Sequence, residues 1–105
     1  MAKMTRTMKE DRKAMMAEFV AMDGVVLSNP FAGVTVVAAP AVACDNPNFV
    51  QVAVSQCDFK DDTFKRKYGE WVALTRWYDG VTMSIPTHGY RDADEVAAEV
   101  LALFE

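Results

Sequence analysis

The hydrophobic positions change their spacing several times along the chain, and each change marks a different predicted element. Across residues 3–22, apolar side chains recur at spacings of four, seven, four and three residues, with charged residues between them. This spacing is typical of an amphipathic helix. Its apolar face consists of Met4, Met8, Met15, Phe19 and Met22. Arg12 interrupts this face, and Asp23-Gly24 predicts the helix end, with Gly24 suited to the left-handed residue after a helix.

Shorter runs of apolar residues in the middle of the chain favour β-structure. The predicted extended segments span residues 25–27, 33–44, 49–57 and 81–85. Breaker residues at 45–48 separate the two longest runs, which we therefore predict to pair as an antiparallel hairpin. A turn of that length makes the numbers of paired residues sum to about 93. Pro40 lacks an N–H, so it predicts a bulge or an edge position in its strand.

Residues 62–79 are predicted to form a second helix, although their spacing also fits a strand that would place Trp71 and Trp77 on one face. Asp61 and Asp62 can begin this helix because carboxylates accept hydrogen bonds from its free N–H groups. In a helix, one face carries Phe64, Tyr68, Trp71, Val72, Thr75 and Tyr78.

The last helix is predicted from its start signal and its apolar face. Asp92 can cap it, with Glu95 three residues later. The predicted buried stripe is Val96, Val100, Leu103 and Phe104. These elements predict one α+β domain over residues 1–105. It has an N-terminal helix, an antiparallel sheet of three to four strands with a central hairpin, and two further helices packed on one face. An open sheet face or edge strand invites self-pairing, so we expect a homodimer.

Composition and charge narrow the class of protein. The chain has 105 residues, of which 51% are hydrophobic and 25% charged, a mixture typical of a globular domain. Residues 1–89 balance ten basic with ten acidic groups, so residues 90–105 supply the net charge of −4. A nucleic-acid mimic needs a more extended field of carboxylates. No apolar run approaches the ~20 residues of a membrane span, and charges interrupt the N-terminus, so we predict a cytoplasmic protein with no membrane partner.

The residues capable of bond-making chemistry are few. The predicted hairpin places Cys44 and Cys57 about eight residues apart along the strands, ~26 Å, whereas a disulfide needs Cα atoms within ~7 Å. We therefore predict two free thiols. His88 is the single histidine, too few for a zinc site with these cysteines. We predict no catalytic residue, no metal and no cofactor; a small enzyme or ligand-sequestering protein centred on His88 and Tyr90 is a minority alternative.

A basic and aromatic cluster at the start of the second predicted helix is the best candidate for partner binding. Its members are Lys65, Arg66, Lys67, Tyr68, Trp71 and Arg76. Cations in a first helical turn oppose the helix dipole, so a compensating anion is expected. Three sources of that anion are open: the acidic last helix of the same molecule or of a second copy, a partner protein, or single-stranded nucleic acid. In the last case Tyr68, Trp71 and Trp77 would stack on bases.

The same segment resembles a pattern in small tailed-bacteriophage accessory proteins, whose roles are mostly unknown. In that pattern a β-strand, here residues 49–57, leads to D-x-F-x-R-K-x-G and then to a helix with A-x-x-R. The matching positions are Asp62, Phe64, Arg66, Lys67, Gly69, Ala73 and Arg76. The resemblance implies a short accessory protein made in the cytoplasm of an infected bacterium. We therefore expect a non-enzymatic protein that binds and modulates a host protein, in host takeover or counter-defence.

Overall fold

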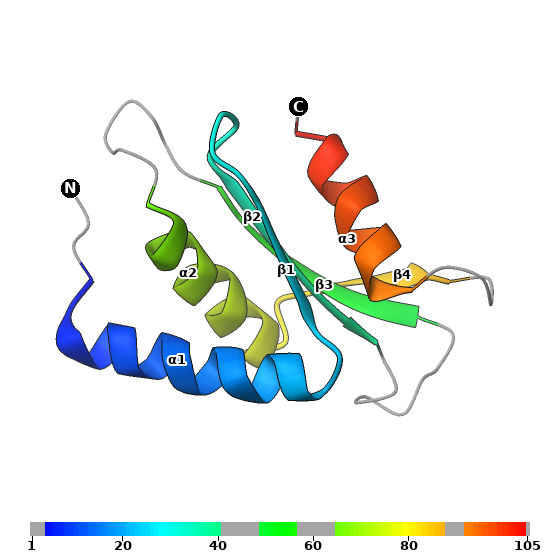
Figure 1. The fold of residues 1–105 in the computed structure, drawn as a ribbon. Helices are drawn as coiled ribbons and strands as arrows, with labels where there is room; N and C mark the ends of the chain where they lie inside the picture. The colour runs from blue at the N-terminus through cyan, green and yellow to red at the C-terminus, as the bar shows by residue number, and fades with distance from the viewer. Residues whose placement is uncertain (1–3, 41–48, 57–64, 88–91, 105) are drawn as a thin grey trace.

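A computed structural model of the protein describes residues 4–40, 49–56, 65–87 and 92–104. The elements are α1 (Arg6–Ala21), β1 (Val25–Asn29), β2 (Val34–Pro40), β3 (Phe49–Gln56), α2 (Arg66–Tyr78), β4 (Met83–Pro86) and α3 (Ala93–Ala102) (Figure 1). The predicted α+β class is confirmed, with its N-terminal helix, central hairpin and two further helices. The sheet has four antiparallel strands in the order β1-β2-β3-β4.

Strand β2 is buried on both of its faces. All six residues from Val34 to Ala39 are buried, in contrast to the half-buried edge strand β1. Val34, Val36 and Ala38 belong to one hydrophobic cluster, whereas Val37 and Ala39 belong to another. Since side chains alternate between the faces of a strand, each face of β2 needs its own covering layer.

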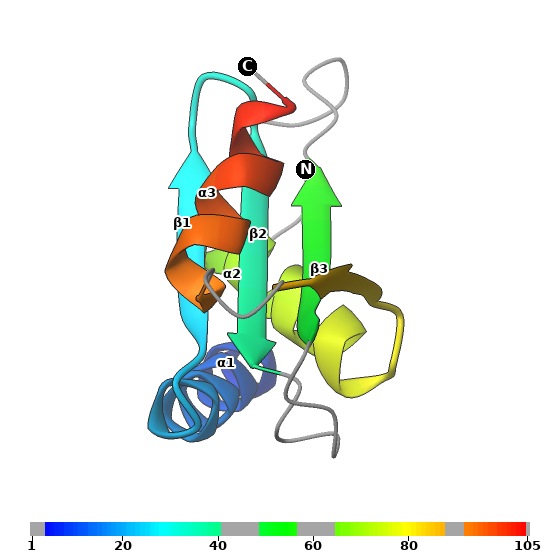
Figure 2. The ribbon, with the colours of Figure 1, turned by 90° about the vertical axis from the view of Figure 1, so that its right-hand side faces the viewer.

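The helices cover opposite faces of the sheet, so the prediction that the two later helices pack on one face is wrong. Helix α3 packs Val96 and Val100 against the first cluster. Helices α1 and α2 contribute Phe19, Leu74 and Trp77 to the second. Figure 2 shows α3 in front of the sheet and the other two helices behind it. The nearly continuous apolar run that forms β2 is typical of a strand buried on both sides.

The predicted hairpin is present, but its register differs from the prediction. Pairing runs from Val34↔Gln56 to Pro40↔Val50, so paired numbers sum to 90. A shift of about three residues reverses which side chains share a face. The predicted turn at 45–48 lies outside the described residues. Strand β2 ends at Pro40, which pairs with Val50 in a central strand, so the predicted bulge or edge position of Pro40 is wrong. Cys44 and Cys57 lie outside the described residues, so their free thiols stay a prediction.

The predicted start of α3 is confirmed, and its end is corrected. Asp92 Oδ1 accepts a hydrogen bond from Glu95 N at 2.9 Å. Val96 and Val100 are buried as expected, and Phe104 packs against the same cluster. Leu103, predicted to be buried, is 81% exposed and lies just beyond the helix, which ends at Ala102.

The turn between α1 and β1 reverses the roles expected for its two residues. Asp23, and not Gly24, takes the left-handed conformation, with φ of 63°. A Cβ atom on Gly24 would lie 2.4 Å from Cδ2 and 2.5 Å from the carbonyl oxygen of Phe19, which is fully buried. Gly24 therefore allows close packing, whereas Asp23 is of a type that tolerates the left-handed region.

Substitutions at these two positions should differ in their effect on stability. We expect Gly24→Ala to lower the free energy of unfolding by about 2 kcal/mol or more, because the added methyl displaces Phe19. Asp23→Gly should change the free energy of unfolding by less than ~0.5 kcal/mol. Glycine removes the steric cost of the left-handed conformation, and this gain offsets the greater entropy of the unfolded chain. Urea denaturation measures both. A larger loss for Asp23→Gly than for Gly24→Ala would contradict the assignment.

Candidate functional site

Helix α2 begins later than predicted and without a side-chain cap. Its first residue is Arg66, and Lys65 before it is extended, with φ of −124° and ψ of 112°. The Lys65 side chain makes no capping hydrogen bond, and the first turn has no acidic residue. Asp61 and Asp62, the predicted start, lie outside the described residues. The buried positions of α2 begin at Gly69, so its first turn does not pack in the core.

The first turn of α2 therefore combines N–H groups that have no partner within the helix with exposed cations. Lys65, Arg66 and Lys67 are all exposed. Each cation near the positive end of a helix dipole costs roughly 0.3–1 kcal/mol at low ionic strength. A bound anion would offset this cost and accept hydrogen bonds from the free N–H groups. The helix start alone does not define a site, but it forms one wall of a larger cavity.

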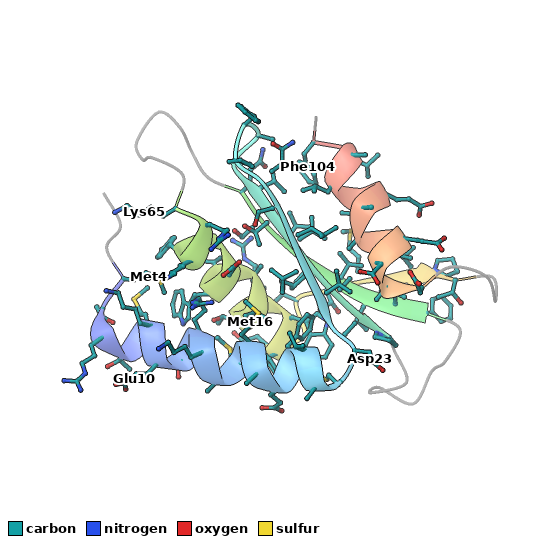
Figure 3. The ribbon with its side chains drawn as sticks, viewed as in Figure 1. Met4, Glu10, Met16, Asp23, Lys65 and Phe104 are labelled. Carbon is teal, nitrogen blue, oxygen red and sulfur yellow. The ribbon has the colours of Figure 1, made fainter. Side chains whose placement is uncertain are left out.

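That cavity, here called the basic groove, has a volume of about 490 Å³ and lies between the first turns of α1 and α2. Its described lining consists of Met4, Lys9, Lys65, Arg66, Lys67 and Tyr68. None of these six residues is acidic, and the half-buried Met4 and Tyr68 add apolar surface between the four cations. Figure 3 labels Met4 and Lys65 at the neighbouring ends of the two helices. The groove thus offers positive charge around an apolar surface.

A largely buried ion pair holds the two helices that form the groove. Arg12 Nη1 on α1 lies 3.2 Å from Glu70 Oε1 on α2, and the two side chains are only 15% and 12% exposed. Arg66 Nε approaches the other oxygen of Glu70 at 3.9 Å. This pair explains why a cation interrupts the apolar face of α1. The position of Arg12 within an apolar face indicated that this residue needs a partner, because a buried charge must be paired. The sequence did not show that the partner is Glu70.

Four of the six predicted binding residues come together, and two lie elsewhere. Lys65, Arg66, Lys67 and Tyr68 line the basic groove. Trp71 lies behind Tyr68, with ring centroids 6.0 Å apart, and its indole N–H is buried without a partner among the described residues. Arg76 Nη1 donates to the Val54 carbonyl at 2.6 Å. Arg76 also lines a smaller cavity of about 220 Å³, which shares Lys65 and Tyr68 with the basic groove. Met4 and Lys9 were missed, because only the packing of α1 brings them to α2.

The cluster does not face the acidic last helix of its own molecule. Helix α3 packs on the opposite face of the sheet from α2, so this intramolecular source of the compensating anion is contradicted. Among the described residues, the ion pair of the cluster is the long contact between Arg66 and Glu70. Within that part of the chain, Lys65 and Lys67 form no ion pair.

Metal binding and membrane insertion find no support in the described part of the chain. Within it, no group of three or more His, Cys, Asp or Glu side chains could hold a metal ion. None of its helices combines the length and apolar character that crossing a membrane requires.

No protein-family model matches this sequence, and neither does any curated protein or solved structure.

Removing one partner of the buried ion pair should destabilise the protein measurably. We expect Arg12→Met to lower the free energy of unfolding by about 2–3 kcal/mol, because Glu70 is then left mostly buried beside a single exposed cation. Arg6→Met is the matched control, since Arg6 pairs with Glu10 on the surface at 94% and 69% exposure. Its effect should stay within ~0.5 kcal/mol. Equal urea midpoints for the two variants would show that the Arg12–Glu70 pair does not hold the helices together.

Proposed function

We propose that this protein is a non-enzymatic binding protein whose basic groove docks an acidic segment of a host protein. The observation that supports this most is the composition of the groove: Lys9, Lys65, Arg66 and Lys67 surround Met4 and Tyr68 with no acidic residue in the described lining. In line with the phage-like motif, the setting that we propose is the cytoplasm of an infected bacterium. The partner would be modulated there in host takeover or counter-defence.

The groove suits carboxylates that flank an apolar side chain. Carboxylates can pair with the lysines and accept hydrogen bonds from the N–H groups at the start of α2. An apolar or aromatic side chain of the segment can pack on Met4 and Tyr68, and the flexible methionine adapts to different shapes. Because the cations are exposed, they contribute mainly to the association rate and to specificity. Added salt weakens their attraction to the carboxylates.

A protein partner fits the structure better than single-stranded nucleic acid. Base stacking was predicted to use Tyr68, Trp71 and Trp77. Trp77 is 9% exposed, and its Nε1 donates to the Gln51 carbonyl at 3.1 Å. Its ring also packs edge-on against Phe19 at a centroid distance of 5.1 Å. Of the three rings, Tyr68 alone lines the groove, and one ring is a poor platform for successive bases.

Two other expectations stay proposals. The edge strands β1 and β4 can each accept a further strand, which is the basis for the proposed homodimer. The minority alternative, a small enzyme or ligand-sequestering protein, is centred on His88 and Tyr90. Both residues lie outside the described part of the chain.

Fluorescence anisotropy with a labelled peptide tests the proposed function. The peptide carries glutamates on both sides of one phenylalanine, and its glutamine counterpart is the neutral control. We expect the double variant Lys65→Ala/Lys67→Ala to bind the acidic peptide about tenfold more weakly, a loss of ~1.4 kcal/mol. The matched variant Arg6→Ala/Lys13→Ala removes two exposed cations outside the groove lining and should change affinity less than about twofold.

Three outcomes of this experiment would contradict the proposal. The two double variants could lose affinity equally, which would show a non-specific charge effect. The glutamine peptide could bind as well as the glutamate peptide. An oligothymidine could bind more tightly than the acidic peptide in the same buffer, which would favour the nucleic-acid alternative.

A further inference from the structure

A second cavity lies at the opposite end of α2 and has the opposite chemistry. It has a volume of about 450 Å³, and α2 contributes Trp77 and Tyr78 to its wall. Glu18 of α1 and Met22, the residue directly after this helix, also line it. We call this cavity the aromatic pocket. The 13 residues of α2 put it roughly 20 Å from the basic groove.

The walls of the aromatic pocket are held by packing and hydrogen bonds. Trp77 lies between two other rings: Phe19 and Tyr78 each pack edge-to-face against it, with centroids 5.1 Å away. Its indole N–H bonds to the Gln51 carbonyl, and the Gln51 side-chain oxygen accepts a hydrogen bond from Thr82 Oγ1 at 2.7 Å. A pocket whose walls are fixed in this way needs little reorganisation when a ligand enters.

The electrostatics of the aromatic pocket favour a cation. No described residue of its lining is a lysine or arginine, and no described cation forms an ion pair with Glu18. The pKa of Tyr78 is raised above its usual value, first by burial of the ring and second by the negative charge of Glu18. The Glu18 carboxylate therefore affects the ionisation of Tyr78. The pocket also lies near the negative, C-terminal end of α2. Arg76, the cation in that last turn, bonds instead to Val54.

We infer that the aromatic pocket binds an organic cation, either an ammonium or a guanidinium group. Glu18 supplies the opposite charge, and the partly exposed ring of Tyr78 supplies the π-face that attracts a cation. Met22 and Trp77 give apolar surface to the carbon chain that carries the charge. Such a group can belong to a lysine or arginine of a protein or to a free amine. The site does not depend on the proposed function of the basic groove.

NMR titration of the ¹⁵N-labelled protein at constant ionic strength tests this inference. The probes are the N-acetyl methyl esters of arginine and lysine, and choline. N-acetyl-norleucine methyl ester is the neutral control. We expect the cations, and not the control, to shift the Trp77 indole N–H and the Gly80 amide in a saturable way. Tighter binding of a blocked amino acid would point to a protein side chain, and tighter binding of choline would point to a free amine.

Three variants separate the aromatic pocket from the rest of the surface. Glu18→Gln should weaken binding of the cations about tenfold, and this exposed position should tolerate the change without loss of the fold. Glu10→Gln removes another exposed carboxylate of α1 and should leave affinity unchanged. So should Lys65→Ala/Lys67→Ala, which disables only the basic groove. The inference is overturned if the norleucine ester binds like the lysine ester, if no cation gives a saturable shift, or if Glu18→Gln binds as tightly as the unaltered protein.

Discussion

Burial of β2 on both faces is the constraint on which the rest of the structure depends. Six consecutive buried residues, Val34 to Ala39, cannot be covered by one layer of helices. Helix α3 therefore covers one face, and α1 and α2 together cover the other. The small residues Gly69 and Ala73 are buried on α2, together with Leu74 and Trp77. Arg76 and Trp77 of α2 bond to carbonyl groups of β3. By contrast, Arg66 and Lys67 are exposed, and with Tyr68 they line the basic groove.

Helix α2 then separates two kinds of chemistry along its length. Its start, which no described side chain caps, carries Lys65, Arg66 and Lys67 and forms the basic groove with the beginning of α1. Its other end presents Trp77 and Tyr78 beside Glu18 of α1, in the aromatic pocket. The Arg12–Glu70 ion pair lies between these ends and joins the same two helices. A partner with an acidic segment and a cationic side chain roughly 20 Å apart could contact both sites.

The sequence predicted what local patterns determine. The helices, the hairpin and the Asp92 cap all follow from spacing and residue type within short windows. The errors arose at features that tertiary contacts determine. The hairpin register differs from the prediction, and α2 begins later than predicted. Much of the candidate site was predicted, from Lys65 to Tyr68. Met4 and Lys9 join it only through the packing of α1, and the burial of Trp77 was hidden because strand and helix spacings both fitted its segment.

The most direct test of the account is a map of where an acidic segment binds. In ¹H–¹⁵N NMR spectra, the glutamate–phenylalanine peptide should shift the amides of Lys9 and of residues 65–68 most strongly, with smaller changes toward Arg12 and Glu70. Amides of α3, on the far side of the sheet, should stay in place. Saturable shifts centred on α3 or on the edge strands, with the first turn of α2 unaffected, would contradict the claim that the basic groove is the docking site.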